Sequence, residues 1–178
     1  MRNKKLQKGF TLIELMTSLS LFIIIMTVSL GSILGVFDAN RKSRSIKTVM
    51  NNLNVALESM SKEMRYGRNY HCGPGNPATA QNCSEGQPNI SFLSSNNEII
   101  SYRVNGTAIE KSVAGGNYYA ITAPEVVIDS LTFYTTGAGT GDGRQPKTIF
   151  VLKGHAGNAK GRSDFSLQTL VSQRALDI

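Results

Sequence analysis

The sequence contains no proline before Pro74 and no formally charged residue from Leu15 to Phe37. Because proline interrupts helices, its absence allows one long helix at the start of the chain. The charge-free run is 23 residues long, and roughly 20 apolar residues are enough to cross a bilayer. We therefore predict a membrane-spanning helix in this part of the chain.

Cysteine and histidine are scarce, with two of each in 178 residues. His71 adjoins Cys72, but with Cys83 these residues leave a zinc site one ligand short of the usual four. The segment GTGDG lacks the lysine and the serine or threonine of a phosphate-binding loop. Serine, histidine and aspartate also form no pattern typical of a catalytic triad. The sequence therefore predicts no metal, no cofactor and no enzymatic activity.

Positive charge dominates the first nine residues, which hold Arg2, Lys4, Lys5 and Lys8 and no acidic residue. This excess keeps the N-terminus cytoplasmic, so the rest of the chain is expected outside the membrane. A secretory signal places its cleavage site after an apolar core of roughly 7 to 15 residues. Here the apolar run is longer, and the candidate cleavage point, Gly9, precedes it. Removal of the four leader charges would lower the net charge from +7 to +3, which weakens any argument from bulk charge to nucleic-acid binding.

Apolar residues continue beyond the membrane run in steps of three and four, the spacing of one helical face. They are Ile46, Met50, Leu53, Leu57, Met60 and Met64. With Gly67 as the end, we predict one helix from Phe10 to Tyr66, about 85 Å long at 1.5 Å per residue. Residues 10–37 form its membrane half and residues 38–67 its amphipathic half.

A basic patch, Arg41, Lys42, Arg44 and Lys47, follows the apolar run. A solvated helix face is the default interpretation, and contact with lipid phosphates or with acidic groups of adjacent subunits is the alternative. Nucleic-acid binding would need aromatic residues interleaved with the basic ones, and Phe37 is the only aromatic residue nearby. The patch therefore does not predict a nucleic-acid partner.

Residues 68–178 have the pattern of a β-rich domain. Residues 68–88 are rich in glycine, proline, asparagine and serine, and we predict a loop there. Strands are expected at residues 98–104, 107–113, 125–135, 147–153 and 164–174, with Asn105-Gly106 as the hairpin turn between the first two. Val127, Leu131 and Phe133 should share one face. The predicted fold class is α+β, a long helix packed on a mostly antiparallel sheet of roughly four to six strands.

The motif GFTLIEL carries a family resemblance. A basic leader that ends in Gly9, followed by Phe10, Thr11, Leu12, Ile13, Glu14 and an apolar helix, resembles the N-terminus of type IV pilins and type II secretion pseudopilins. The resemblance covers residues 1–37 closely, and the layout of helix then sheet extends it loosely to the whole chain.

The resemblance implies how the protein is processed and where it goes. A prepilin peptidase, a membrane-embedded aspartate protease, would cut after Gly9 and methylate the new N-terminal residue, Phe10. Further implied partners are other pilin or pseudopilin subunits and an inner-membrane assembly platform. The chain would sit in the cytoplasmic membrane as a single-pass protein and then enter a periplasmic or extracellular filament. The alternative is an uncleaved signal anchor in which the motif is coincidental.

Glu14 is the one acidic residue near the start of the apolar run. A lone carboxylate in hydrocarbon costs on the order of several kcal/mol, and such residues are usually paired or functional. Cleavage would create an amine on Phe10, four residues earlier on the same helical face, so Glu14 could pair within its own subunit. The resemblance implies a second partner, the amine of a neighbouring subunit, which makes Glu14 an assembly residue. The alternative is a carboxylate solvated at the headgroup level.

Gly31 and Gly35 form a pair of small residues four apart, which allows close helix approach and weakens the helix. Many major pilins carry a proline in this part of the helix, and Gly31 is a candidate for the same softening role. The alternative is that both are simply the glycines common in membrane helices.

Cys72 and Cys83 enclose ten residues in a region that we expect outside the cytoplasm, where a disulfide closing the loop 72–83 is favoured over free thiols. Some major pseudopilins bind calcium in a late loop, and residues 137–143 contain Asp142. One carboxylate falls well short of the roughly six to eight oxygens that calcium takes, so we predict a plain flexible loop there.

These features predict a structural filament subunit rather than an enzyme. The sheet-rich body, the disulfide beside the helix and the terminal strand SLQTLVSQR are similar to minor pilins and minor pseudopilins of the J or W type. The alternative is a competence or adhesion pilin whose exposed loops bind DNA or a surface. Binding to phosphates would show a steep dependence on salt.

Overall fold

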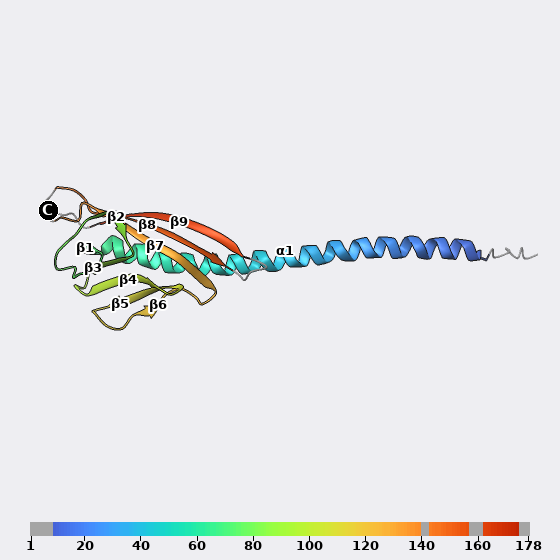
Figure 1. Cartoon of the computed structure of the whole chain (residues 1–178), viewed down its shortest axis with the longest axis horizontal. Coiled ribbons are helices and arrows are strands. Elements are labelled where there is room, and N and C mark those ends of the chain that lie inside the picture. Colours follow the sequence, from blue (N-terminus) through green and yellow to red (C-terminus); the bar gives the residue numbers. More distant parts are fainter. Residues whose placement is uncertain (1–8, 140–142, 157–161, 175–178) are drawn as a thin grey trace, which may run out of the picture. The chain divides into compact units, whose positions relative to one another are not determined.

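The computed structural model describes residues 9–139, 143–156 and 162–174. The chain divides into two compact units, Met1–Ser43 and Arg44–Ile178. Helix α1 (Leu12–Tyr66) supplies the described structure of the first unit and the start of the second (Figure 1). The prediction of one long N-terminal helix is confirmed, with the helix beginning two residues later than expected.

In the second unit, the helical stripe is buried as its spacing predicts. Leu53, Met60 and Met64 are fully buried, and Leu57 is 7% exposed. Ile46, which precedes the first buried residue of the helix, Val49, is only half-buried, and so is Met50.

Among the described residues, nine strands form two antiparallel sheets (Figure 1). The five-stranded sheet has the order β1-β3-β4-β5-β6, and the four-stranded sheet has the order β2-β7-β8-β9. The strand bounds are β1 Arg68–Cys72, β2 Cys83–Gln87, β3 Asn89–Leu93, β4 Ile99–Asn105, β5 Ala108–Val113, β6 Tyr119–Ala120, β7 Val126–Thr136, β8 Lys147–Ala156 and β9 Ser163–Ser172. The α+β class is confirmed.

The prediction of a single sheet of four to six strands is wrong. The prediction of a loop over all of residues 68–88 is also wrong. The two ends of that segment form β1 and β2, which belong to different sheets. Tyr70 and Cys72 of β1 are buried, as is Cys83 of β2, because these few side chains face the core despite polar neighbours. Strand β3 was missed because its five residues are too few to show a clear alternation.

Strand β7 also departs from the predicted pattern. Its pairing with β8 shifts register between Ile128 and Ser130, so a bulge reverses which alternate residues face the core. Val126 and Ile128 are buried before the bulge and Leu131 and Phe133 after it. Val127 therefore lies on the opposite face from Leu131 and Phe133, and its predicted place is wrong.

The hairpin between β4 and β5 is confirmed, with its turn one residue later than predicted. Asn105 pairs with Ala108, so the two loop residues are Gly106 and Thr107. Gly106 has φ +59°, and glycine in the first position of a two-residue hairpin loop supplies this left-handed conformation without strain.

The core of the second unit is aromatic at its centre. The ring of Phe92 lies between those of Tyr70 and Tyr102, with centroids 5.8 and 6.1 Å away. In the four-stranded sheet, the rings of Phe133 and Phe150 are 6.2 Å apart. Gly67, at the end of α1, is required by this packing, because a Cβ there would overlap the Phe92 ring.

Candidate processing and assembly segment

The predicted cleavage point lies in an accessible segment just before α1. Gly9, Phe10 and Thr11 are not helical, and all three are exposed. The Phe10 side chain is 86% exposed, and a Cβ at Gly9 would meet no atom within 4 Å. A peptide bond in this position can enter the active site of a protease without unwinding the helix.

Thr11 and Glu14 close the start of the helix as a capping box. The Thr11 backbone N–H donates to Glu14 Oε2 at 3.1 Å, and the Thr11 hydroxyl donates to the same oxygen at 2.9 Å. In return, the Glu14 backbone N–H lies 3.4 Å from Thr11 Oγ1. The Glu14 carboxylate is therefore folded back over the first turn, toward the residue that directly follows Phe10.

This capping role was missing from the sequence interpretation. The signal for it was present, since threonine at position 11 and glutamate at position 14 have the spacing of a capping box before an apolar run. The same carboxylate thus satisfies donors at the helix start and lies close in sequence to the nitrogen that cleavage would release.

The helix that follows is apolar and uncovered in the first unit. Leu12–Tyr66 contains a window apolar enough to cross a membrane, and none of that window is buried. Ile24 is 63% exposed and Leu34 also 63%. Hydroxyl groups in this part of the helix donate to backbone carbonyl oxygens one turn earlier. The Ser18 hydroxyl, for example, donates to the Glu14 backbone oxygen at 2.7 Å, so these groups add little free polar surface.

Gly31 and Gly35 lie four residues apart within α1, and a Cβ at either would meet nothing within 4 Å. The helix is α-helical through both positions, so their softening role stays a prediction. Arg41, Lys42, Arg44 and Lys47 are all exposed. Asp142, the one carboxylate of the loop 137–143, which we predicted to bind no calcium, falls outside the described residues.

The disulfide between Cys72 and Cys83 is present, which confirms this pairing. It joins β1 of the five-stranded sheet to β2 of the four-stranded sheet. The two sulfur atoms lie 3.6 and 3.3 Å from the Phe133 carbonyl oxygen, and both cysteines are buried. The bond therefore connects the two sheets inside the core rather than tying down a surface loop.

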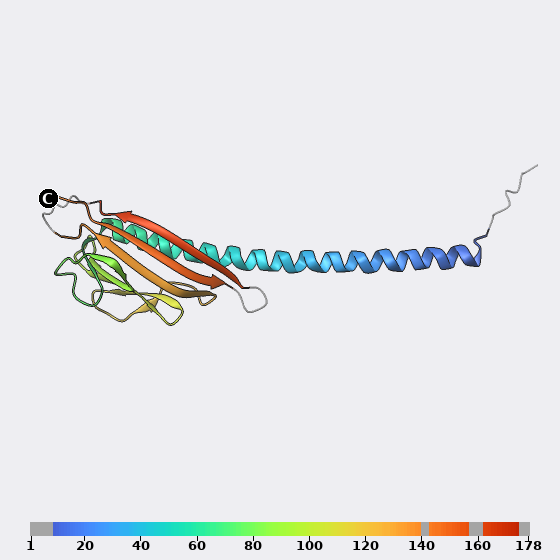
Figure 2. The same cartoon turned by 45° about the horizontal axis from the view of Figure 1, so that its top comes forward.

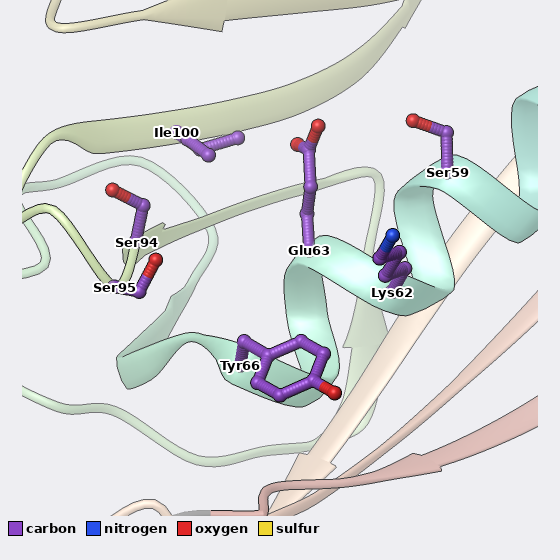
Figure 3. Close-up of a pocket in the computed structure, with 7 residues that line it drawn as sticks. All are labelled: Ser59, Lys62, Glu63, Tyr66, Ser94, Ser95 and Ile100. Carbon is purple, nitrogen blue, oxygen red and sulfur yellow. The ribbon is translucent and has the colours of Figure 1, made fainter.

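A shallow pocket of about 360 Å³ lies beside the last turns of α1 in the second unit. Figure 3 shows Ser59 and Glu63 extending from the helix toward the strand that carries Ile100. The Glu63 carboxylate is already occupied, since Tyr102 Oη and Lys111 Nζ each donate to it at 2.6 Å. Burial is the main cause that raises the pKa of Tyr102, and its hydrogen bond to Glu63 raises it further. This arrangement holds α1 to the sheet and is not that of a catalytic acid.

No group of three or more histidine, cysteine, aspartate or glutamate side chains could hold a metal ion among the residues described.

Comparison with known proteins bears on the N-terminal segment alone. Residues 4–30 match the family model described as the prokaryotic N-terminal methylation motif. This match supports the resemblance to type IV pilins and pseudopilins, and with it pilin-type processing of the N-terminus. No curated protein and no solved structure matches the chain.

Proposed function

We propose that the chain is a structural subunit of a type IV pilus or a type II secretion filament. The observation that carries this proposal is the methylation motif at residues 4–30, followed by an apolar helix with no covering inside its own unit. The protein would be cut between Gly9 and Phe10, methylated on Phe10 and assembled through α1. In this role it performs no catalysis.

The exposed apolar helix explains why such a subunit needs two environments. Before assembly, residues 10–37 would lie in the bilayer, with the N-terminus cytoplasmic and the β-rich domain outside. In a filament, helices of neighbouring subunits would replace the lipid. The glycines at positions 31 and 35 favour such packing, because small residues let helix backbones approach closely. Prepilin peptidase, other pilin or pseudopilin subunits and the assembly platform are the partners this requires.

Glu14 would act as the registration residue of assembly. Removal of residues 1–9 gives Phe10 a cationic amine next to Thr11, whose N–H already donates to the Glu14 carboxylate. An amine of a neighbouring subunit can compete for the same carboxylate in an apolar surrounding, where an unpaired charge is costly. A helix sliding out of register would lose this pair, so the pair would set the axial position of the incoming subunit.

Within this class we propose a minor subunit, of the kind that resembles the J or W type. Support comes from the body of two sheets, the disulfide directly after α1 and the regular terminal strand β9.

The proposal is tested by co-expressing the chain with a prepilin peptidase and following the loss of residues 1–9 on a gel and by mass. Gly9→Val should leave the chain uncut, because a branched side chain would stand next to the scissile bond. Gly31→Val is the matched control, because it makes the same substitution in the first unit but away from the scissile bond. It should be cut as the wild type is. Equal cleavage of all three chains, or of none, would contradict the proposal.

A further inference from the structure

One asparagine in the second unit stands apart in both sequence and structure. Asn105 is followed by Gly106, and this is the only Asn-Gly pair among the 178 residues. The pair lies at the tip of the hairpin between β4 and β5, where Asn105, Gly106 and Thr107 are all exposed. The backbone nitrogen that follows an asparagine can attack the side-chain amide carbon, and glycine hinders this attack least because it has no Cβ.

The attacking nitrogen is available in the part of the chain that the structure describes. The Gly106 N–H donates no hydrogen bond there, because residues 106 and 107 form the loop and the pair that closes it is Asn105 with Ala108. A Cβ at Gly106 would meet no atom within 4 Å, so the surroundings leave room for the loop to change shape. The nitrogen can therefore reach the preceding side chain without giving up a hydrogen bond.

The side chain under attack is held by an exposed hydrogen bond. Asn105 Nδ2 donates to Glu110 Oε1 at 3.1 Å. A bond of this kind adds little net stability, because water replaces it when the side chain moves away. Exposed hairpin tips also open more readily than the centres of strands. The Asn105 side chain is thus free to turn toward the Gly106 nitrogen.

The other asparagines of the described chain lack this combination. Asn97 and Asn117 are exposed, but each precedes a residue with a large side chain that shields the following nitrogen. Asn76 precedes a proline, whose nitrogen carries no hydrogen. The chemistry is therefore specific to residue 105.

We propose that Asn105 is a site of spontaneous modification, at which the Gly106 nitrogen displaces the side-chain amide group and the residue becomes aspartate or isoaspartate. The bond from the Gly106 nitrogen to Asn105 Cγ forms as the bond from Cγ to Nδ2 breaks. The amide group leaves as ammonia with the proton of the Gly106 nitrogen. Water then opens the resulting succinimide, at the side-chain carbonyl to give aspartate or at the main-chain carbonyl to give isoaspartate.

Both products remove a hydrogen-bond donor from Glu110. Hydrogen bonds from Asn105 and then from Arg103 hold the pKa of Glu110 below its ordinary value of 4.5, so Glu110 is ionised at neutral pH. A carboxylate in place of the Asn105 amide would face this charge, and like charges on neighbouring strands destabilise their pairing. Arg103, whose Nε donates to Glu110 at 2.9 Å, would offset part of the repulsion.

Isoaspartate also changes the main chain at the turn. It adds a methylene group between residue 105 and Gly106, so the loop no longer closes the pair of Asn105 and Ala108 in its present register. The turn is tied to the other sheet, because the Ile128 N–H donates to the Thr107 oxygen at 2.9 Å. Figure 2 shows the hairpin, in yellow-green, beside the start of β7. The modification should therefore loosen both the hairpin and its attachment to β7.

The test is ageing of the full, uncut chain in detergent micelles at mildly alkaline pH, followed by trypsin digestion and mass spectrometry. Trypsin cuts after Arg103 and Lys111, so Asn105 is the only asparagine of peptide 104–111, whereas peptide 69–103 holds six asparagines and no Asn-Gly pair. A sample digested before ageing gives the background.

We expect Asn105 to convert at least about tenfold faster than the average asparagine of peptide 69–103, which corresponds to a barrier lower by roughly 1.4 kcal/mol. The product should separate into two forms of equal mass, and an isoaspartyl methyltransferase should label one of them. In the aged chain the Ala108 amide, which pairs with residue 105 across the turn, should exchange at least about tenfold faster than in the fresh chain.

Two variants separate this chemistry from general ageing. Asn105→Gln keeps an amide but places it one methylene farther away, where ring closure is less favourable. It should stop the conversion and leave the exchange of Ala108 unchanged after ageing. Asn117→Gln makes the same substitution at another exposed position and should leave the conversion of Asn105 as in the wild type.

Three results would overturn the proposal. Conversion of Asn105 no faster than that of the asparagines in peptide 69–103 would show that the fold protects the pair. Conversion without isoaspartate would indicate direct hydrolysis and contradict attack by the Gly106 nitrogen, and conversion that leaves Ala108 exchange unchanged would contradict the effect on the hairpin. None of these results bears on cleavage at Gly9, so this inference and the proposed function fail separately.

Discussion

The two units of the chain use the same kinds of side chain in opposite ways. In the first unit Phe22, Ile25 and Leu30 are all more than half exposed, whereas in the second Leu53, Met60 and Met64 have no exposed surface. The second unit closes its own core with two sheets. In the described part of the first unit there is only a helix, and its apolar side chains have no covering there.

The largest expected effect separates the buried stripe from the exposed face of the same helix. Leu53→Ala should lower the free energy of unfolding by about 2–5 kcal/mol, because Leu53 is fully buried. Val55→Ala, at a residue 69% exposed, should cost less than about 0.5 kcal/mol. Chemical denaturation followed by tyrosine fluorescence measures both, since the chain has no tryptophan. Similar losses for the two variants would break the comparison.

The second prediction concerns the bond between the two sheets. The double variant Cys72→Ala/Cys83→Ala should lose about 2–3 kcal/mol of stability, the value that the loop-entropy account gives for a loop of this length. The matched measurement is the wild type with and without reductant, which should show a similar loss. A midpoint of unfolding unchanged by both treatments would show that the core holds the sheets together without the bond.

The third prediction sharpens the contact between α1 and the five-stranded sheet. Glu63→Gln should cost about 1–2 kcal/mol, because it weakens charge-assisted bonds from Lys111 and Tyr102 at a site that is only partly exposed. Glu58→Gln, on the exposed part of the same helix, is the control and should be nearly neutral. A double-mutant cycle with Tyr102→Phe would reveal the coupling, and strictly additive losses would contradict it.

The smallest predicted effect is a pH dependence of the β4–β5 hairpin. Hydrogen bonds from Asn105 and then Arg103 hold the pKa of Glu110 below its ordinary value of 4.5. A carboxyl whose pKa is lowered by folding stabilises the folded state above its unfolded pKa, and this contribution is lost as the pH falls through the folded pKa. The stability difference between wild type and Glu110→Gln should therefore be constant near pH 6 and shrink below about pH 4.5. A difference that grows on acidification would reverse the assignment.

The sequence predicted the features that depend on long periodic patterns. The helix to Tyr66 and its buried stripe follow from apolar residues at regular steps with no proline in between. Strand β9 follows from alternating residues, and β8 was predicted as residues 147–153, three residues shorter than it is. The pairing of Cys72 with Cys83 was also predictable, because there is only one pair to form.

The features that escaped prediction are local or depend on distant contacts. β1 and β2 have too few core residues to stand out from their polar neighbours, and the bulge in β7 reverses its faces without any marked residue at Asp129 or Ser130. That the disulfide connects two sheets could not be foreseen while a single sheet was expected. The capping box of Thr11 and Glu14, by contrast, is a local feature that the spacing of threonine and glutamate before an apolar run could have predicted.

The most direct test of the central claim is mass spectrometry of the protein isolated from its native membranes and filaments. The account predicts an N-terminal peptide that begins at Phe10 and carries one added methyl group on its amine. Assembled material in which residues 1–9 are still attached would contradict it.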